Sequence, residues 1–236
     1  MEQRGSHYGD LLMQHFFTNR FEGVSEAPFE SLNFGLHVND TALHVNQNRE
    51  ILKAKLGVSK LVFMDQVHGD TITQIHRGDE MPTCDAMITD VSGIALAVMV
   101  ADCIPILYYD ERHHAIGVAH AGRVGTLLQV GPKCARVMAE TFGTRMEELT
   151  IWMGPSIHSC CYEVGYEATQ GFETALHVKN GKYFLDLQNA NLKAFLDMGI
   201  KRKNIMVSEV CTCCDSRYFS YRRDKITGRF AGVIAL

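Results

Sequence analysis

The sequence predicts an α+β fold in which mixed β-sheets are flanked by helices, within a single domain that spans residues 1–236. Short apolar runs bounded by turn residues alternate with amphipathic stretches, but without strict strand–helix–strand regularity. The 236 residues are 46% hydrophobic, which is enough for a sizeable core. No repeat, low-complexity tract or linker divides the chain.

The individual elements follow from these patterns. Helices are expected where apolar residues recur at helical spacing and a glycine follows, and Pro132 should interrupt the second of them. The expected helices are 45–56, 127–141 and 187–198. Strands are expected at 13–18, 61–67, 71–75, 94–100, 115–119, 149–153, 205–208 and 230–236.

Composition excludes several classes of protein. The net charge of −4 argues against a broad basic surface for nucleic acid. No apolar stretch reaches the roughly 18–20 residues of a membrane helix, so no membrane partner is expected. The polar segment 1–10 lacks the apolar core of a signal peptide, which predicts a cytoplasmic protein. In that compartment the eight cysteines are expected to be thiols or ligands rather than disulfides.

Three strand-like runs end beside soft metal ligands or nucleophiles. These residues are His68, Cys103 and His120. Two imidazoles and one thiolate that face a common point form an open zinc site, with a fourth position free for water or substrate. Cys103 has two other interpretations, a core thiol or a covalent nucleophile. Asp102 is a candidate proton shuttle or a carboxylate that orients a ligand.

Other motifs are less specific. Asp85 and Asp90 flank a short apolar segment, and either is suited to orient a ligand histidine or to cap a turn. The glycine-containing junction 120–126 suits an anion such as phosphate. Cys211 and Cys214 have half of a zinc-binding spacing without a visible partner pair, and the doubled cysteine at 160–161 is interpreted as structural.

Eight blocks in order carry a resemblance to a known family. They are SLNFGLHVND (31–40), DQVHGD (65–70), CDAMITD (84–90), ADCIPILYYD (101–110), AHAG (119–122), GPSI (154–157), CYEVG (161–165) and FSYRRDKITGRFAGVIAL (219–236). The chain resembles the YfiH/YlmD family, which carries the polyphenol oxidoreductase-laccase label and includes purine nucleoside phosphorylases. The resemblance implies a YfiH-like fold with α/β/α layers.

The resemblance also implies roles for particular residues. The family's metal and catalytic positions fall on His68, Cys103 and His120. Asp102 is a further catalytic candidate by analogy with zinc deaminases, which pair the metal with a carboxylate acid/base. Expected substrate-binding residues are Asn33, Gln66, Arg123 and Arg222. One departure concerns the residues after His-Ala-Gly, where Arg123-Val124 replaces the family's tryptophan followed by a basic residue. This replacement bears on substrate identity more than on the metal site.

The expected function is a zinc-dependent purine nucleoside enzyme. The resemblance implies phosphorolysis of adenosine, inosine and methylthioadenosine, with adenosine deaminase activity besides. The partners are then a purine nucleoside and phosphate, and the protein is expected to be a monomer or homodimer. Cu²⁺ is a possible alternative metal, because it also prefers imidazole and thiolate.

Three other functions remain open from the sequence. A copper-dependent polyphenol oxidase is disfavoured because the chain has no His-x-His pair. A cysteine hydrolase acting on peptidoglycan precursors would use Cys103 as nucleophile, His120 as base and Asp102 as orienter. A non-catalytic binding module would need none of these residues for turnover.

Overall fold

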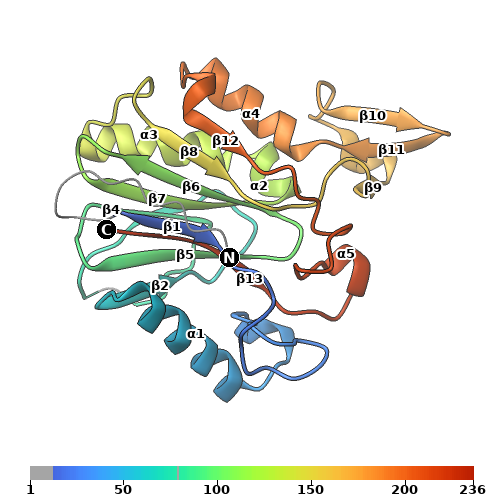
Figure 1. Ribbon diagram of the computed structural model, residues 1–236. Coiled ribbons are helices and arrows are strands. Elements are labelled where there is room, and N and C mark those ends of the chain that lie inside the picture. Colours follow the sequence, from blue (N-terminus) through green and yellow to red (C-terminus); the bar gives the residue numbers. More distant parts are fainter. Residues whose placement is uncertain (1–12, 79) are drawn as a thin grey trace.

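Two β-sheets lie stacked between layers of helices in the computed structural model (Figure 1). The structure describes residues 13–78 and 80–236, so the polar N-terminal segment 1–10 lies outside the described residues. Within that described part, no helix combines the length and apolar character needed to cross a membrane.

The larger sheet has six strands and mixed pairing. In spatial order they are β12 (Ile205–Val207), β8 (Thr150–Met153), β6 (Ile104–Asp110), β7 (Ala115–Ala121), β4 (Ala86–Thr89) and β3 (Ile72–Gln74). Its outer pairs β12–β8 and β3–β4 are parallel, and the inner pairs are antiparallel.

The second sheet has four strands. In spatial order they are β1 (Gln14–Phe17), β13 (Phe230–Ala235), β5 (Ile94–Val100) and β2 (Lys60–Phe63). Strand β5 is buried over its whole length. Side chains such as Val98 of β5 and Val118 of β7 belong to the core between the two sheets. Each fully buried side chain of this kind contributes about 1.5–3 kcal/mol to folding.

Helices cover the outer face of each sheet. The six-stranded sheet packs against α3 (Val130–Phe142) and α4 (Leu187–Asp197), and the four-stranded sheet packs against α1 (Ala42–Leu56). The α+β class with mixed sheets and flanking helices is therefore confirmed. The structure differs from the expected α/β/α arrangement because two stacked sheets lie between the helices, so the layers are α/β/β/α.

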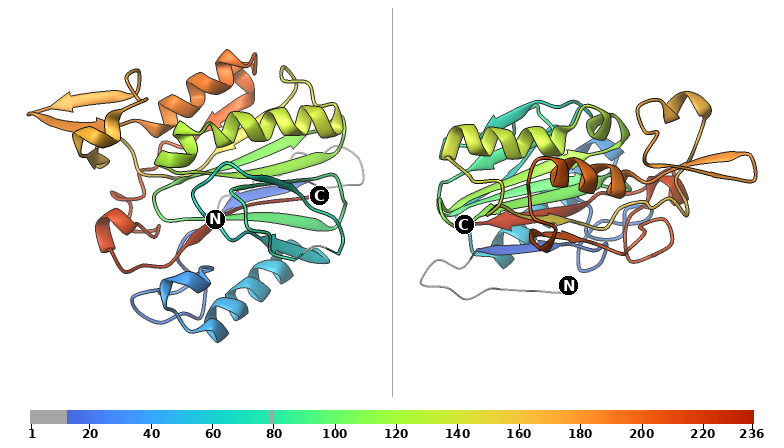
Figure 2. Two further views of the ribbon diagram at one scale, coloured as in Figure 1. Left: turned by 180° about the vertical axis from the view of Figure 1, so that it is seen from behind. Right: turned by 90° about the horizontal axis from the view of Figure 1, so that it is seen from above.

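A small sheet extends from one end of the molecule (Figure 2). It contains β10 (Leu176–Lys179), β11 (Lys182–Leu185) and β9 (Glu163–Val164). The remaining helical elements are α2 (Arg123–Leu127), α5 (Tyr221–Asp224) and the 3₁₀ turns η1 (Leu36–Val38), η2 (Tyr166–Thr169) and η3 (Arg202–Asn204).

Two sequence expectations change in detail. The helix expected at 127–141 is interrupted near Pro132 as predicted, but the break lies between α2 and α3, and Pro132 falls in the first turn of α3. A proline is tolerated there, since the first-turn N–H groups have no partner within the helix. The strand expected at 61–67 ends at Phe63, and the chain then turns toward His68.

Candidate metal centre

The structure brings His68, Cys103 and His120 together. Their ligand atoms all lie within 4.8 Å of one another, and the two imidazole rings are 4.7 Å apart between centroids. His120 is only 3% exposed, Cys103 is half-buried and His68 is exposed. One side of the group is therefore open to solvent.

The local backbone explains this convergence. Cys103 lies in the turn between β5 and β6, and His120 lies in β7 opposite Pro105 of β6. Gly122 follows β7, and a Cβ atom at that position would lie 2.8 Å from the Cys103 sulfur. A glycine is therefore needed at position 122 to leave room for the thiolate.

Asp85 holds both histidines in place. It is fully buried, and its Oδ1 accepts a hydrogen bond from Nδ1 of His120 at 2.8 Å. The same carboxylate accepts the backbone N–H groups of Val67, His68 and Gly69 at 3.2, 3.0 and 2.6 Å. These bonds support the turn in which His68 has φ +60°. Nε2 of His120 is left to bind a metal ion, the arrangement usual for ligand histidines.

The pKa values of Cys103 and His120 move in opposite directions. Burial alone would raise the pKa of Cys103, but the charge of His120 and hydrogen bonds from His120 and His68 lower it to about 6. Burial alone would lower the pKa of His120, but Cys103 and Asp85 raise it to about 9. Without metal the pair is thus a thiolate and an imidazolium near neutral pH. The thiolate is also the form in which cysteine binds metals.

This pair predicts the reactivity of metal-free protein. With a pKa near 6, about nine-tenths of Cys103 is thiolate at pH 7, against about 3% for an unperturbed cysteine. We expect iodoacetamide to modify Cys103 at a rate that falls as pH drops through about 6 and levels off above pH 7. Peptide mass mapping separates Cys103 from the other thiols. A rate that keeps rising up to pH 9 would contradict this account.

Asp102 lies beside the three donors but is already hydrogen-bonded. Its carboxylate accepts the hydroxyl of Thr212 at 2.7 Å and the backbone N–H of Arg222 at 2.6 Å. Its backbone carbonyl accepts the N–H of Ile157 at 2.8 Å. These bonds fix the turn that carries Cys103 and favour a positioning role. Proton transfer by Asp102 remains a prediction.

Asn33 and Gln66 are likewise engaged by the protein. Asn33 is fully buried, and its Oδ1 accepts the backbone N–H groups of Gly35 and Arg229 at 2.9 and 2.8 Å. The Gln66 amide forms two hydrogen bonds with the backbone of Met99. Both side chains therefore position loops near the site, and direct contact with substrate remains a prediction for each.

The two arginines that were predicted to bind substrate, Arg123 and Arg222, differ in how firmly the rest of the protein holds their side chains. Nη1 of Arg222 donates to the carbonyls of Cys161 and Glu163 at 3.0 and 2.8 Å. Its guanidinium also lies 5.2 Å from the ring centroid of Tyr162. Arg123 is half-buried and begins α2, a helix of only five residues. Of the two, Arg123 has the side chain less committed to the fold.

Sequence reasoning did not single out Arg229. Its guanidinium is close enough to Cys103 and Asp102 for their charges to raise its pKa, although burial is the larger effect and lowers that pKa. Gly35 allows close packing here, because a Cβ atom on it would lie 2.9 Å from Cγ of Arg229 and 3.4 Å from His37. Arg229 lies inside a block that was used for the resemblance, but its residue type gave no separate signal.

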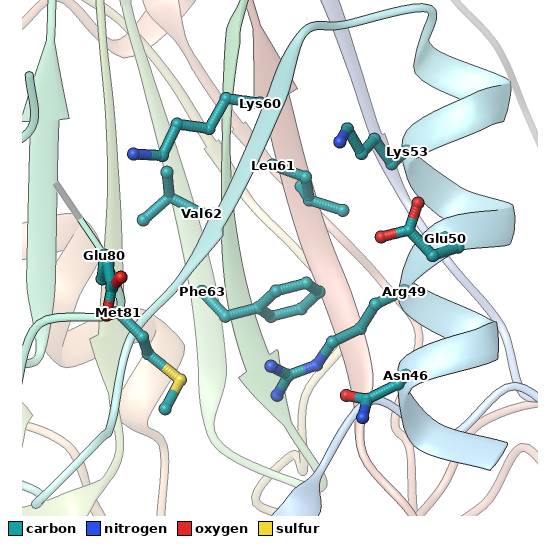
Figure 3. A pocket seen from close by; sticks show the side chains of 10 residues that line it. All are labelled: Asn46, Arg49, Glu50, Lys53, Lys60, Leu61, Val62, Phe63, Glu80 and Met81. Carbon is teal, nitrogen blue, oxygen red and sulfur yellow. The ribbon is translucent and has the colours of Figure 1, made fainter. Parts of the chain in front are cut away.

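A pocket between α1 and β2 is a different feature (Figure 3). It has a volume of about 290 Å³, and its lining residues include none of the three donors. Arg49 points across it, with its guanidinium 4.2 Å from the Phe63 ring centroid. Arg49 also donates to the carbonyl of Phe34 at 2.8 Å. This arginine therefore ties α1 to the neighbouring sheet.

The protein has an α/β/β/α fold. At an open edge of that fold, two imidazoles and one thiolate form a group that is suited to bind a metal ion. Comparison with known proteins identifies the family. Residues 14–236 match the family described as multi-copper polyphenol oxidoreductase laccase, and the chain belongs to this family.

Relatives and solved structures agree with this assignment. The chain is 37% identical to a purine nucleoside phosphorylase of Streptomyces coelicolor, covering 98% of this chain and 96% of the relative. It is 34% identical to purine nucleoside phosphorylase YfiH of Escherichia coli, covering 93% and 92%. The crystal structure of Bacillus licheniformis hypothetical protein YfiH has a TM-score of 0.91 at 34% identity, covering 95% and 92%. YlmD from Geobacillus stearothermophilus has a TM-score of 0.90 at 29% identity, covering 99% of each chain.

Proposed function

We propose that this protein is a zinc-dependent purine nucleoside phosphorylase that acts on adenosine, inosine and methylthioadenosine in the cytoplasm. The observation that carries the proposal is the open group of His68, Cys103 and His120, in a chain whose relatives are named purine nucleoside phosphorylases. The eight free thiols of the structure suit a reducing compartment.

The three donors fit a zinc ion. Two imidazole nitrogens and one thiolate within 4.8 Å of one another leave the fourth tetrahedral position to water or substrate. A bound zinc ion would supply Lewis acidity at this position. Asp85 keeps His120 in the tautomer whose Nε2 faces the other donors. Copper is the alternative metal, but three donors make at most one mononuclear centre.

The reaction needs a second group of residues to hold phosphate. Arg229 and Arg123 are the candidates for this, since forked N–H donors suit phosphate oxygens. Nη1 of Arg229 already donates to the backbone carbonyls of Thr227 and Gly228 at 3.0 Å each, so the other N–H groups of its guanidinium would hold the phosphate. A phosphate oxygen forms a bond to C1′ of the sugar while the C1′–N9 bond breaks. The purine leaves with the bonding electrons and takes up a proton, which solvent delivers past the exposed His68. The products are a free purine and ribose 1-phosphate, or 5-methylthioribose 1-phosphate when methylthioadenosine is the substrate.

We expect Arg229→Met to raise the KM for phosphate by about 10–100-fold, because a hydrogen bond to a charged group contributes roughly 1.5–3 kcal/mol. The KM for inosine should change little. Phosphate saturation curves at fixed inosine measure both effects. Arg136→Met, which removes an exposed arginine of α3, is the matched control. An unchanged phosphate KM in Arg229→Met would remove Arg229 from the phosphate site.

Adenosine deamination is the proposed side activity. It needs a carboxylate acid/base beside the metal, and Asp102 would have to give up a hydrogen bond from Thr212 or Arg222 to serve. We therefore expect deamination to be the slower of the two reactions. Ammonia release and purine release from adenosine, measured in the same assay, give the ratio directly.

A cysteine hydrolase is the second candidate, because one observation favours it. Cys103, His120 and Asp85 form a hydrogen-bonded chain of nucleophile, base and orienter, in which Asp85 takes the role expected of Asp102. Alkylation of protein that was purified without a chelator distinguishes the two functions. Zinc-bound protein resists alkylation at Cys103, whereas a metal-free hydrolase loses activity in step with alkylation.

A further inference from the structure

Four other cysteines form a compact group outside the first site. Cys160 and Cys161 lie in the turn after β8, and Cys211 and Cys214 lie in the turn after β12. All four sulfurs are within 4.8 Å of one another. Three of the sulfur pairs, 161–214, 160–161 and 160–214, are 3.3, 3.7 and 3.8 Å apart. The half-motif in the sequence thus has its partner pair in space.

The fold builds this group from backbone pairing. Strands β8 and β12 are parallel neighbours, so the chain leaves both at the same edge of the sheet. The pairing continues beyond the strands, where Ser156 bridges to Cys211 and accepts the N–H of Thr212 at 3.0 Å. Two tight turns then present the thiols, with the N–H of Cys161 donating to His158 and that of Cys214 donating to Cys211.

We propose that Cys160, Cys161, Cys211 and Cys214 bind a structural zinc ion. Four thiolates at about 2.3 Å from zinc in a tetrahedron lie about 3.8 Å apart. The observed separations of 3.3–3.8 Å approach that value and are well beyond a disulfide's length of about 2.05 Å. The backbone N–H of His158 lies 3.5 Å from the Cys211 sulfur, where it stabilises a thiolate.

The ion would have four protein ligands and no open position, which is the pattern of a structural site. It would join two turns that are hydrogen-bonded to Asp102, the neighbour of Cys103, one directly and the other through Arg222. The carbonyl of Cys161 accepts a hydrogen bond from Arg222, whose backbone N–H holds Asp102. Thr212, which follows Cys211, donates its hydroxyl to the same carboxylate. Zinc at the four cysteines would therefore stabilise the two turns that hold Asp102 in place beside Cys103.

The test is zinc content in full-length protein purified under reducing conditions, without chelator or nickel affinity. Wild type should contain two zinc ions per chain, and Cys214→Ser should contain one. Cys214 is exposed, so this change leaves the core intact. Cys213→Ser, in the same turn but outside the group, is the matched control and should keep two. Cys103→Ala should keep the ion at the four cysteines, which separates this proposal from the proposed function.

Cobalt identifies the ligands directly. Cys103→Ala protein loaded with Co²⁺ should show the intense visible bands of four thiolate ligands, and the further change Cys214→Ser should alter or remove them. Cys214→Ser should also lower the Tm. Zinc content that is unchanged in Cys214→Ser would overturn the proposal. A disulfide that persists in reductant, or iron with inorganic sulfide in place of zinc, would overturn it equally.

Discussion

Replacement of Cys103 by alanine should remove one zinc ion per chain and lower kcat/KM for phosphorolysis by at least about a hundredfold. Cys103 supplies the only anionic donor among the three residues of the site. Loss of a residue that merely supports a ligand already costs roughly 10–100-fold in metal affinity or activity, and loss of a ligand itself should cost more. Metal analysis by mass spectrometry and purine release from inosine measure the two effects.

Cys213→Ala is the control for this experiment. Cys213 is half-buried and belongs to neither group of metal-type donors. It should keep both its zinc and its activity. Thermal denaturation of both variants checks that the fold is retained. Full activity in Cys103→Ala would show that the thiolate takes no part in the reaction.

Asp85→Asn should have the second largest effect, because one change disturbs two ligands. The carboxylate accepts four N–H groups, and an amide would turn its own N–H₂ toward some of them. We expect a loss of roughly 10–100-fold in zinc affinity and kcat/KM. Buried donors left without a partner should also lower the free energy of unfolding by about 1–3 kcal/mol.

The pKa of Asp85 sets the pH range of this effect. Burial alone would raise it, but hydrogen bonds from His120 and the backbone of Gly69 lower it below its usual value. The stabilisation from this carboxylate is therefore present above the usual aspartate pKa of about 3.9 and is lost as pH falls through the lower folded value. Asp85→Asn should lose it throughout the neutral range.

Asp90→Asn is the matched control, since Asp90 is an exposed carboxylate just after β4. Zinc titration by competition with a chromophoric chelator and urea unfolding measure the two quantities. We expect Asp90→Asn to match wild type in both. An Asp85→Asn protein with wild-type zinc affinity would mean that the histidines are held by something other than this carboxylate.

Several strands were predictable from sequence, but β4, β6 and the small sheet of β9, β10 and β11 were not among those expected, and neither was the layering of the sheets. Strand β5 is apolar over its whole length, and β1, β8 and β13 also lie close to their predicted ranges. A strand that is buried on both faces has the same sequence pattern whether a helix or a second sheet covers it. The stacking of two sheets therefore had no signal in the residues themselves.

The group of His68, Cys103 and His120 was partly predictable from sequence. Cys103 and His120 lie at strand ends, as their apolar runs predict, whereas His68 lies beyond the end of β2 in a turn that the Asp85 carboxylate holds in place. Asp85 was recognised only as one of two candidates, because four hydrogen bonds to one carboxylate are a property of the folded chain.

Features that depend on distant pairings were not predictable. The four-cysteine group joins Cys161 to Cys214, 53 residues apart, through the parallel pairing of β8 and β12. Arg229 reaches the site because its backbone N–H bonds to Asn33, 196 residues away. Neither contact leaves a local pattern in the sequence.

We propose that the site with His68, Cys103 and His120 carries out metal-dependent phosphorolysis. The most direct measurement is the formation of ribose 1-phosphate and hypoxanthine from inosine, with and without phosphate, in native, chelator-treated and zinc-restored protein. We predict equal amounts of both products, formed only with phosphate, lost on metal removal and regained with zinc. Hypoxanthine release at the same rate without phosphate, or in metal-free protein, would contradict this account.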